Sequence, residues 1–136
     1  MQRNSFSWPV RVYYEDTDAG GIVYYANYLK YFERARTEWL RALGVEQDIW
    51  LAQQVAFVVA EVQMQNKKAA KFNEQLTVLS EISSLKRASM VFKQDIFNAL
   101  GQLICHAEVK VACVDSVQLK AQMIPAEIIE VLTRGK

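Results

Sequence analysis

The chain has 136 residues and a hydrophobic content of 51%, which suits one compact domain with a substantial buried core. Its 16 Lys and Arg residues are balanced by 15 Asp and Glu residues, so no overall charge attracts nucleic acid or an anionic membrane surface. The N-terminal segment lacks the apolar stretch of a signal peptide, and no apolar run reaches the roughly 18 residues of a membrane span. We therefore expect a single domain, residues 1–136, in the cytoplasm, with no nucleic-acid partner and no membrane insertion.

The first part of the chain predicts one strand and one long helix. Residues 8–15 alternate apolar and polar side chains, which is typical of a strand. The side chains on its expected apolar face are Val10, Val12 and Tyr14. From about Tyr25 to Leu43 apolar residues recur every three or four positions, which predicts an amphipathic helix that ends at Gly44. The expected buried face of this helix consists of Tyr28, Phe32, Ala35, Trp39 and Leu43.

The rest of the chain is rich in strands. A short helical segment at residues 46–54 is followed by four segments of β-forming residues, which we expect to pair as an antiparallel meander. These segments are residues 55–65, 74–85, 88–98 and 102–114. Asn98 to Gly101 provide a tight turn between the last two segments, and residues 125–134 predict a closing helix with Pro125 in its first turn.

One long helix with an apolar face beside about five antiparallel strands predicts an α+β fold in which the sheet covers the helix. Such a sheet has an open edge, and an uncovered edge strand can pair with another chain. A two-fold dimer with one continuous sheet would cover that edge. We therefore expect the chain to form a dimer.

The cysteines and the histidine predict neither a disulfide nor a metal site. Cys105 and Cys113 fall on the same face of one expected strand, about 26 Å apart, so they cannot bridge each other within that strand. The chain has no Cys-x-x-Cys motif, and His106 is its only histidine. His106 shares a strand face with Glu108 and Lys110, where we expect a solvated pair rather than a catalytic base.

A turn with three carboxylates, residues 15–21, lies directly before the long helix. Asp residues are common in turns and at helix starts because their side chains accept hydrogen bonds from nearby backbone N–H groups, so the turn alone favours a structural cap. A calcium loop is a poor alternative, because the segment lacks the regularly spaced oxygen ligands and the closing glutamate of an EF-hand.

This turn is part of a longer motif at residues 11–38, which reads RVYYEDTDAGGIVYYANYLKYFERARTE. With VAFVV and VACVD further along the chain, the motif resembles hotdog-fold thioesterases, and in particular the YbgC-type acyl-CoA thioesterases encoded beside the Tol-Pal genes. The resemblance covers nearly the whole chain. It implies a hotdog fold, in which an antiparallel sheet of about five strands wraps around one long central helix.

The resemblance also implies an activity, the hydrolysis of an acyl-CoA to a free carboxylic acid and CoA. The acyl group would be carried by CoA or by acyl carrier protein, and the reaction would need no cofactor and no metal. The assembly implied is a homodimer, or a homotetramer that is a dimer of dimers.

The residue that the resemblance implies as the essential carboxylate is Asp18, the second aspartate of the turn. A thioester is already activated toward acyl transfer, so its hydrolysis needs one group that attacks or deprotonates water, and donors for the oxyanion. Unpaired N–H groups at the start of the following helix can supply those donors. Gly20 and Gly21 would let the backbone turn sharply and approach the thioester, while Glu15 and Asp16 are expected to be turn or surface groups. The sequence leaves open whether Asp18 is the nucleophile or the general base.

Tyr25 stands where many YbgC-type sequences have a histidine, seven residues after the aspartate. The aroyl-CoA branch of the same superfamily, which hydrolyses 4-hydroxybenzoyl-CoA, has a tyrosine at this place and directs its backbone N–H toward the thioester carbonyl. The similarity to that branch implies that Tyr25 is an oxyanion donor through its backbone. Its ring either packs over the first helical turn or enters the substrate pocket.

The acyl pocket is expected to be lined by aromatic and aliphatic side chains, which suit either an aliphatic or an aromatic acyl group. The candidates are Tyr24, Tyr25, Phe57 and Val59. Residues 33–36, ERAR, are a family marker on the long helix, and we interpret them as ion pairs that fix the helix against its neighbour.

Basic residues are candidates for binding the phosphates of CoA, which match guanidinium and ammonium donors. Lys86 and Arg87 are expected at the start of a strand, where the aroyl-CoA branch also clusters basic residues, although a solvated loop explains them equally well. Lys67, Lys68 and Lys71 are weaker candidates.

Two other functions are compatible with such a fold. A non-catalytic module that binds acyl groups or acyl carrier protein would bind a non-hydrolysable CoA ester without turnover. A hotdog dehydratase is disfavoured, because those enzymes use a histidine and His106 lies far from the acidic turn.

Overall fold

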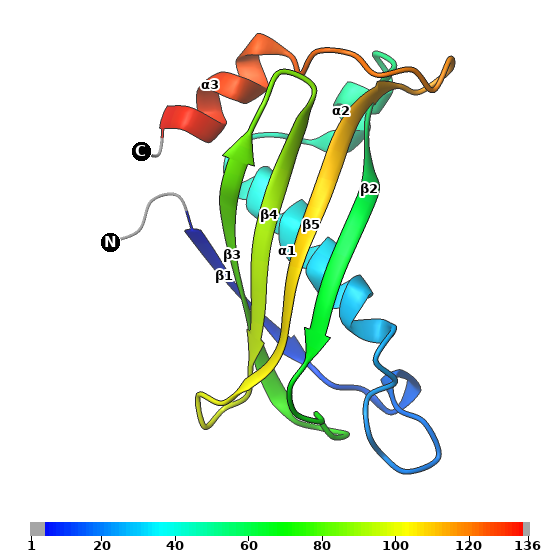
Figure 1. Ribbon diagram of the computed structural model, residues 1–136, viewed down its shortest axis with the longest axis vertical. Helices are drawn as coiled ribbons and strands as arrows, with labels where there is room; N and C mark the ends of the chain where they lie inside the picture. The colour runs from blue at the N-terminus through cyan, green and yellow to red at the C-terminus, as the bar shows by residue number, and fades with distance from the viewer. Residues whose placement is uncertain (1–4, 135–136) are drawn as a thin grey trace.

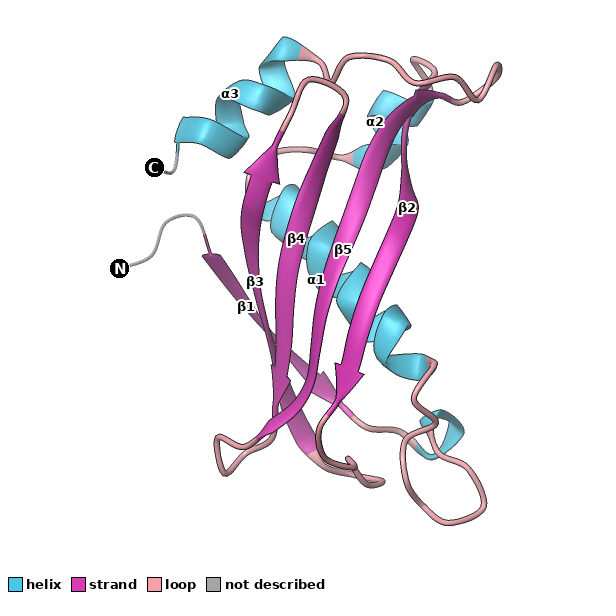
Figure 2. Cartoon of the chain, viewed as in Figure 1, coloured by secondary structure: helices cyan, strands magenta, loops and turns pink. Residues whose placement is uncertain are grey.

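The computed structural model describes residues 5–134, in which five antiparallel strands form one sheet and a long helix lies along one face of it (Figure 1). The strands are β1 (Ser5–Arg11), β2 (Val55–Asn66), β3 (Gln75–Leu85), β4 (Ser89–Phe97) and β5 (Leu103–Asp115). The helices are α1 (Asn27–Ala42), α2 (Gln47–Leu51) and α3 (Ala126–Arg134), with a short 3-10 helix at Tyr14–Asp16. Figure 2 shows that α1 crosses behind the strands, whereas α2 and α3 lie near one end of the sheet. This arrangement confirms the predicted α+β fold.

The order of the strands in the sheet is β1-β3-β4-β5-β2, so only β3, β4 and β5 are neighbours in chain order. β2 pairs with β5, from Val55 opposite Asp115 to Asn66 opposite Cys105, and β1 pairs with β3. The prediction of a four-strand meander is therefore wrong for β2. The connection between β2 and β3, residues 67–74, is longer than a hairpin loop of about two to five residues. Its length lets the chain pass β5 and β4 before it re-enters the sheet as β3.

The apolar face of α1 packs against the sheet as its spacing predicts. Tyr28, Phe32, Ala35 and Trp39 are buried, and Leu43, just past the helix, is half-buried. Burial of each large apolar side chain contributes about 1.5–3 kcal/mol, so tertiary packing rather than intrinsic propensity holds this helix in place.

The end of α1 also lies where the sequence predicts it. Gly44 has a φ of +93°, a left-handed conformation that is typical of the glycine after a helix. The N–H groups of Gly44 and Val45 donate to the carbonyls of Arg41 and Leu40 at 2.9 and 2.8 Å. The last helical turn is thus closed by the backbone itself.

The first strand ends earlier than predicted, at Arg11. Val12 is buried as expected, but Tyr14 is 79% exposed and does not share its face. The reason is a hydrogen bond of 2.8 Å from the N–H of Tyr13 to the carboxylate of Asp16, which turns the chain into the 3-10 helix.

The closing helix α3 begins directly after Pro125, whose carbonyl accepts the N–H groups of Ile128 and Ile129 at 3.0 and 3.1 Å. Ile128 and Leu132 are buried, so α3 covers apolar surface of the rest of the domain. Of the helices in residues 5–134, none combines the length and the apolar character that crossing a membrane requires.

Both cysteines are buried on β5 and carry free thiols, as predicted. Burial, assisted by the nearby Asp95, raises the pKa of Cys105 to about 12. Burial also raises the pKa of Cys113. Because the thiolate is the reactive form of cysteine, neither side chain is a nucleophile at neutral pH.

Candidate active site

The acidic turn is a closed loop that presents Asp18 to solvent. The N–H of Asp18 donates to the carbonyl of Ile22 at 3.0 Å, and the carbonyl of Asp18 accepts the N–H of Gly21 at 3.0 Å. Gly21 has a φ of +76°, which a residue with a side chain adopts only with strain. The N–H of Gly20 donates to Oδ1 of the exposed Asp18 carboxylate at 2.9 Å. Oδ2 has no hydrogen-bond partner within residues 5–134, so one carboxylate oxygen is free for chemistry.

Asp16 is a structural member of the same turn, as expected. Its carboxylate, only 8% exposed, accepts the N–H of Tyr13. Its carbonyl accepts the N–H of Tyr24 at 3.1 Å and the side-chain amide of Asn27 at 2.8 Å. The buried hydroxyl of Tyr31 has no hydrogen bond of good geometry within the described residues. Burial and the nearby Asp16 carboxylate nevertheless raise the pKa of Tyr31 well above its ordinary value, so the hydroxyl stays protonated.

The start of α1 presents N–H groups without partners. The helix begins at Asn27, slightly later than predicted, because the N–H of Asn27 first closes a turn onto the carbonyl of Tyr24 at 2.8 Å. Within residues 5–134 the N–H groups of Tyr25 and Ala26 donate no hydrogen bond. A helix N-terminus with free N–H groups carries a partial positive charge and suits an anion, so these two groups can receive a developing oxyanion.

The rings of Tyr24 and Tyr25 are about half exposed, and their centroids lie 5.2 Å apart. Tyr25 lines a groove of about 320 Å³ together with Lys67 and Lys68. These two lysines, which are the weaker phosphate-binding candidates of the sequence analysis, therefore share a hollow with Tyr25 and with Tyr28 of α1.

Phe57 and Val59 line a different pocket, of about 110 Å³, between α1 and the sheet. Its apolar wall also includes Met90, Phe92 and Val111. The two tyrosines before α1 are not part of this lining. One chain alone thus does not bring the four expected acyl-pocket residues together.

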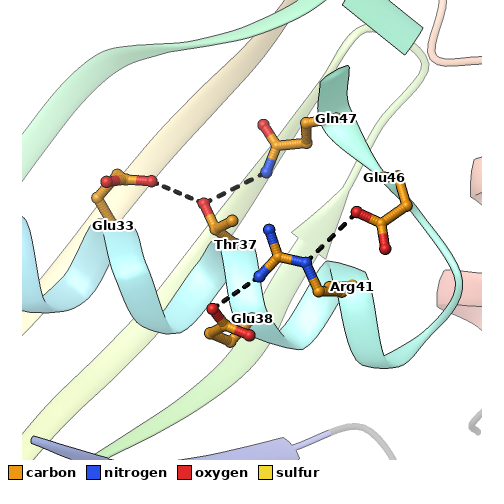
Figure 3. Close-up of polar contacts among 6 residues, drawn as sticks. All are labelled: Glu33, Thr37, Glu38, Arg41, Glu46 and Gln47. Atoms are coloured by element: carbon orange, nitrogen blue, oxygen red, sulfur yellow. Dashed lines mark hydrogen bonds and ion pairs between the residues drawn. The ribbon is translucent and has the colours of Figure 1, made fainter. Parts of the chain in front are cut away.

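The polar wall of this pocket comes from α1 and α2 (Figure 3). The hydroxyl of Thr37 donates to the carboxylate of Glu33 at 2.6 Å, and the amide of Gln47 donates to the Thr37 hydroxyl at 3.4 Å. Beside them Arg41 bridges Glu38 and Glu46 at 2.7 and 3.3 Å. These exposed ion pairs contribute little stability, but they connect the last turn of α1 to the start of α2.

Arg36 is buried in the wall of this pocket, and the interpretation of residues 33–36 as ion pairs that fix the helix against its neighbour is wrong for this residue. Within residues 5–134 the Arg36 guanidinium has no ion-pair partner. It donates instead to Oε1 of Gln94 at 3.0 Å and lies 5.9 Å from the centre of the Phe92 ring. Burial lowers the pKa of Arg36 to about 10, so it remains charged at neutral pH. A neutral amide and an aromatic face satisfy this cation where a carboxylate was expected.

Sequence reasoning missed Gln94, the acceptor for that guanidinium. Its amide also donates to the carbonyl of Phe32 at 3.1 Å and to the hydroxyl of Ser80 at 2.9 Å. The signal was present in the alternation of β4, where Gln94 occupies an inward position between Phe92 and Ile96. A polar side chain on the core face of a strand must find hydrogen-bond partners.

Lys86 and Arg87 are exposed in the turn between β3 and β4, not at the start of a strand as expected. This turn is tied to the end of β5, where the N–H of Cys113 donates to the carbonyl of Ala88 at 2.8 Å. Figure 1 shows the turn at the opposite end of the sheet from the loop before α1. One chain alone therefore does not bring these cations to Asp18.

His106 pairs mainly with a neighbouring strand. Its Nδ1 lies 2.6 Å from Oδ1 of Asp95 on β4, whereas its Nε2 lies 3.9 Å from Glu108. The expected pair with Glu108 is thus the weaker contact, because the directly opposite position in the sheet is Asp95. His106 lines neither of the two hollows described above.

The chain is similar in sequence to known proteins of one family. Residues 12–132 match the thioesterase-like superfamily. The acyl-CoA thioesterase YbgC of Haemophilus influenzae is 49% identical over 130 residues, which cover 94% of each chain. The acyl-CoA thioester hydrolase YbgC of Escherichia coli is 45% identical over 129 residues, which cover 95% of this chain and 96% of that one.

Solved structures show the same fold. A DHNA-CoA thioesterase from Staphylococcus aureus superposes with a TM-score of 0.91, at 22% identity, over 96% of this chain and 89% of that one. This likeness confirms the hotdog architecture that the sequence motif implied. The chain belongs to the thioesterase-like superfamily and, within it, to the YbgC family of acyl-CoA thioesterases.

Proposed function

We propose that the protein hydrolyses acyl-CoA thioesters, with Asp18 as the reacting carboxylate and the N–H groups of Tyr25 and Ala26 as oxyanion donors. The observation that carries this proposal is the single loop that joins them. Asp18 has an unengaged carboxylate oxygen, and the N–H groups that follow at the start of α1 have no partner within residues 5–134. A carboxylate and an oxyanion site are the two components that thioester hydrolysis needs.

The reaction can proceed in two ways from this arrangement. In one, a carboxylate oxygen of Asp18 attacks the thioester carbon, the CoA thiolate leaves, and water hydrolyses the resulting mixed anhydride. In the other, Asp18 takes a proton from a water molecule as that water attacks the thioester carbon, and the C–S bond then breaks so that CoA leaves and the free acid forms. In both, negative charge develops on the carbonyl oxygen, where the partial positive charge of the α1 N-terminus stabilises it.

The exposed edge of β2 supports a dimer in which two β2 strands pair. β2 is an edge strand of the sheet, and Val58, Val59 and Val62 on it are 38–49% exposed. Apolar edge strands are sites of pairing between chains. A two-fold axis would set the two β2 strands antiparallel, and the same contact can occur once in a dimer or twice in a dimer of dimers.

Such a dimer would also join the separated parts of the site. Antiparallel β2 strands place the Asp18 end of one copy beside the Lys86 end of the other. The Phe57 and Val59 pocket of the second copy then lies toward the first copy's acidic turn, and the second copy's Lys86 and Arg87 lie within reach of CoA phosphates. We therefore propose active sites at the subunit interface, with CoA or acyl carrier protein as the acyl carrier.

Thiol release from a panel of aliphatic and aromatic acyl-CoA esters tests the activity. We expect turnover by the wild-type protein and its loss in Asp18→Asn. No turnover on any ester, with saturable binding of a non-hydrolysable analogue, would favour the non-catalytic binding module instead. Single-turnover hydrolysis in water enriched in heavy oxygen separates the two roles of Asp18, because a first-turnover acid free of label requires attack by Asp18 itself.

A further inference from the structure

We propose that Asn27 is a positioning residue of the active site, whose side-chain amide fixes Asp18 relative to the N–H donors at the start of α1. This inference rests on the function proposed for Asp18. Its basis is that residues on the two sides of the loop that carries Asp18 are joined by hydrogen bonds to one backbone carbonyl.

That carbonyl belongs to Asp16. It accepts the N–H of Tyr24, on the returning side of the loop, at 3.1 Å, and the Nδ2 amide of Asn27 at 2.8 Å. Between these points the loop is closed on itself by the bond from the N–H of Asp18 to the carbonyl of Ile22. The Asp16 carbonyl is therefore the point at which hydrogen bonds join the loop that carries Asp18 directly to the start of α1.

Asn27 makes hydrogen bonds to residues on both sides of the loop that carries Asp18. Its backbone N–H donates to the carbonyl of Tyr24 at 2.8 Å, while its side chain reaches the carbonyl of Asp16. Asn27 is also the first residue of α1, whose next turn is anchored by the buried Tyr28 and Tyr31. The amide thus transmits the fixed position of the helix to the loop that carries Asp18.

The loop does not depend on this amide to fold. Two backbone bonds attach it independently to the β2–β3 connection, one from the N–H of Val23 to the carbonyl of Ala70 at 2.8 Å and one from the N–H of Phe72 to the carbonyl of Gly21 at 3.0 Å. Catalysis is more sensitive than folding to such a contact, because a displacement of about 1 Å can lower a rate by about a hundredfold. Loss of the Asn27 amide should therefore reduce kcat while leaving the protein folded.

The test is a double-mutant cycle on kcat for a CoA ester. We expect Asn27→Ala to lower kcat by about 30-fold with little change in KM, because geometry rather than binding is lost. Asn27→Asp is nearly isosteric but its ionised side chain cannot donate a hydrogen bond, so its kcat should fall by the same factor. This variant replaces Asn27→Ala in the test if the alanine variant does not fold. In the Asp18→Asn background the further loss from Asn27→Ala should be under about threefold, because residues that act as a unit are not additive.

Asn98 is the matched control. It is a half-buried asparagine whose side chain closes the β4–β5 turn, donating to Gln102 at 2.8 Å and accepting the N–H of Leu100 at 3.0 Å. Asn98→Ala should lower the melting temperature as much as Asn27→Ala does, with kcat unchanged. If Asp18→Asn is impaired but Asn27→Ala lowers kcat by the same factor in the wild-type and Asp18→Asn backgrounds, the role of Asn27 is overturned and the proposed function stands. Full activity of Asp18→Asn would overturn the proposed function and this inference with it.

Discussion

The two ends of α1 differ in how their unpaired backbone groups are satisfied. At the C-terminal end, Gly44 adopts a left-handed conformation and the N–H groups of Gly44 and Val45 close the last turn. At the N-terminal end, Tyr25 and Ala26 keep N–H groups that no residue within 5–134 accepts, and an acidic loop stands before them. Every α-helix leaves such groups at both ends. The closed end contributes to stability, and the open end is the one at which we propose that the substrate oxyanion is received.

The largest effect should follow from removing the carboxylate at the open end. Asp18→Asn is expected to lower kcat by about a thousandfold, because an amide neither attacks the thioester nor takes a proton from water. Thiol release measures the rate, and circular dichroism should match the wild-type spectrum. Glu15→Gln changes another exposed carboxylate of the same turn and should stay within about threefold of wild type. Near-full activity in Asp18→Asn would contradict the assignment.

Removing an N–H donor from the open end should have the next largest effect. Tyr25→Pro deletes the N–H just before α1 and is expected to lower kcat by about a hundred to a thousandfold. Tyr25→Phe keeps both the ring and the N–H, so its kcat should change by less than about tenfold. Because Ala26 also has a free N–H, Ala26→Pro reports whether one donor or two act. Proline restricts the preceding residue, so a melting curve must accompany each assay.

The opposite outcome would change the model of the open end. If Tyr25→Phe were inactive while Tyr25→Pro folded and turned over normally, the tyrosine hydroxyl, and not the backbone, would be the functional group.

A smaller effect should follow at the far end of the sheet from Asp18. Joint replacement of Lys86 and Arg87 by alanine is expected to raise KM for CoA esters about tenfold, the loss of roughly one charge-assisted phosphate contact. A pantetheine thioester lacks the nucleotide phosphates, so its KM should not change. The variant for comparison is the joint replacement of Lys67 and Lys68 by alanine. It also removes two lysine or arginine charges, but from the groove beside Tyr25 and not from the turn between β3 and β4. Equal effects of the first pair on both substrates would show that Lys86 and Arg87 are solvated loop residues.

The smallest effect on catalysis should come from the closed end of α1. Gly44→Ala places a side chain at a φ of +93° and should lower the free energy of unfolding by about 1–2 kcal/mol while leaving kcat unchanged. Gly21→Ala, at a φ of +76° in the acidic turn, should have a similar strain energy but also lower kcat. Chemical denaturation measures the first quantity and thiol release the second. A loss of kcat in Gly44→Ala would remove the distinction between the two ends.

Local patterns predicted much of this molecule correctly. The spacing of Tyr28, Phe32, Ala35 and Trp39 predicts the buried face of α1, because a helix repeats every 3.6 residues whatever surrounds it. The glycine at position 44 predicts its end for an equally local reason. The candidate role of Asp18 depends on the family motif, because the bare turn favours a structural cap.

The features that sequence reasoning could not predict depend on contacts between distant residues. The place of β2 beside β5 follows from a long connection that allows several strand orders. The partner of Arg36 is Gln94, 58 residues away, and the local sequence around Arg36 contains no sign that its acceptor is a neutral amide. The early end of β1 depends on the carboxylate of Asp16 turning back to Tyr13, which alternation alone does not reveal.

The buried contact between Arg36 and Gln94 has a consequence for how α1 is seated. Gln94 also donates to the carbonyl of Phe32 and to the hydroxyl of Ser80. One side-chain amide thus makes hydrogen bonds to Phe32 and Arg36, which lie on consecutive turns of the helix. If α1 slid along the sheet by one turn, about 5.4 Å, a buried guanidinium would lose its acceptor, which is far more costly than exchanging one apolar contact for another. Apolar surfaces tolerate sliding and this polar contact does not. The contact fixes the register of α1 along the sheet, and with it the position of the N–H groups of Tyr25 and Ala26.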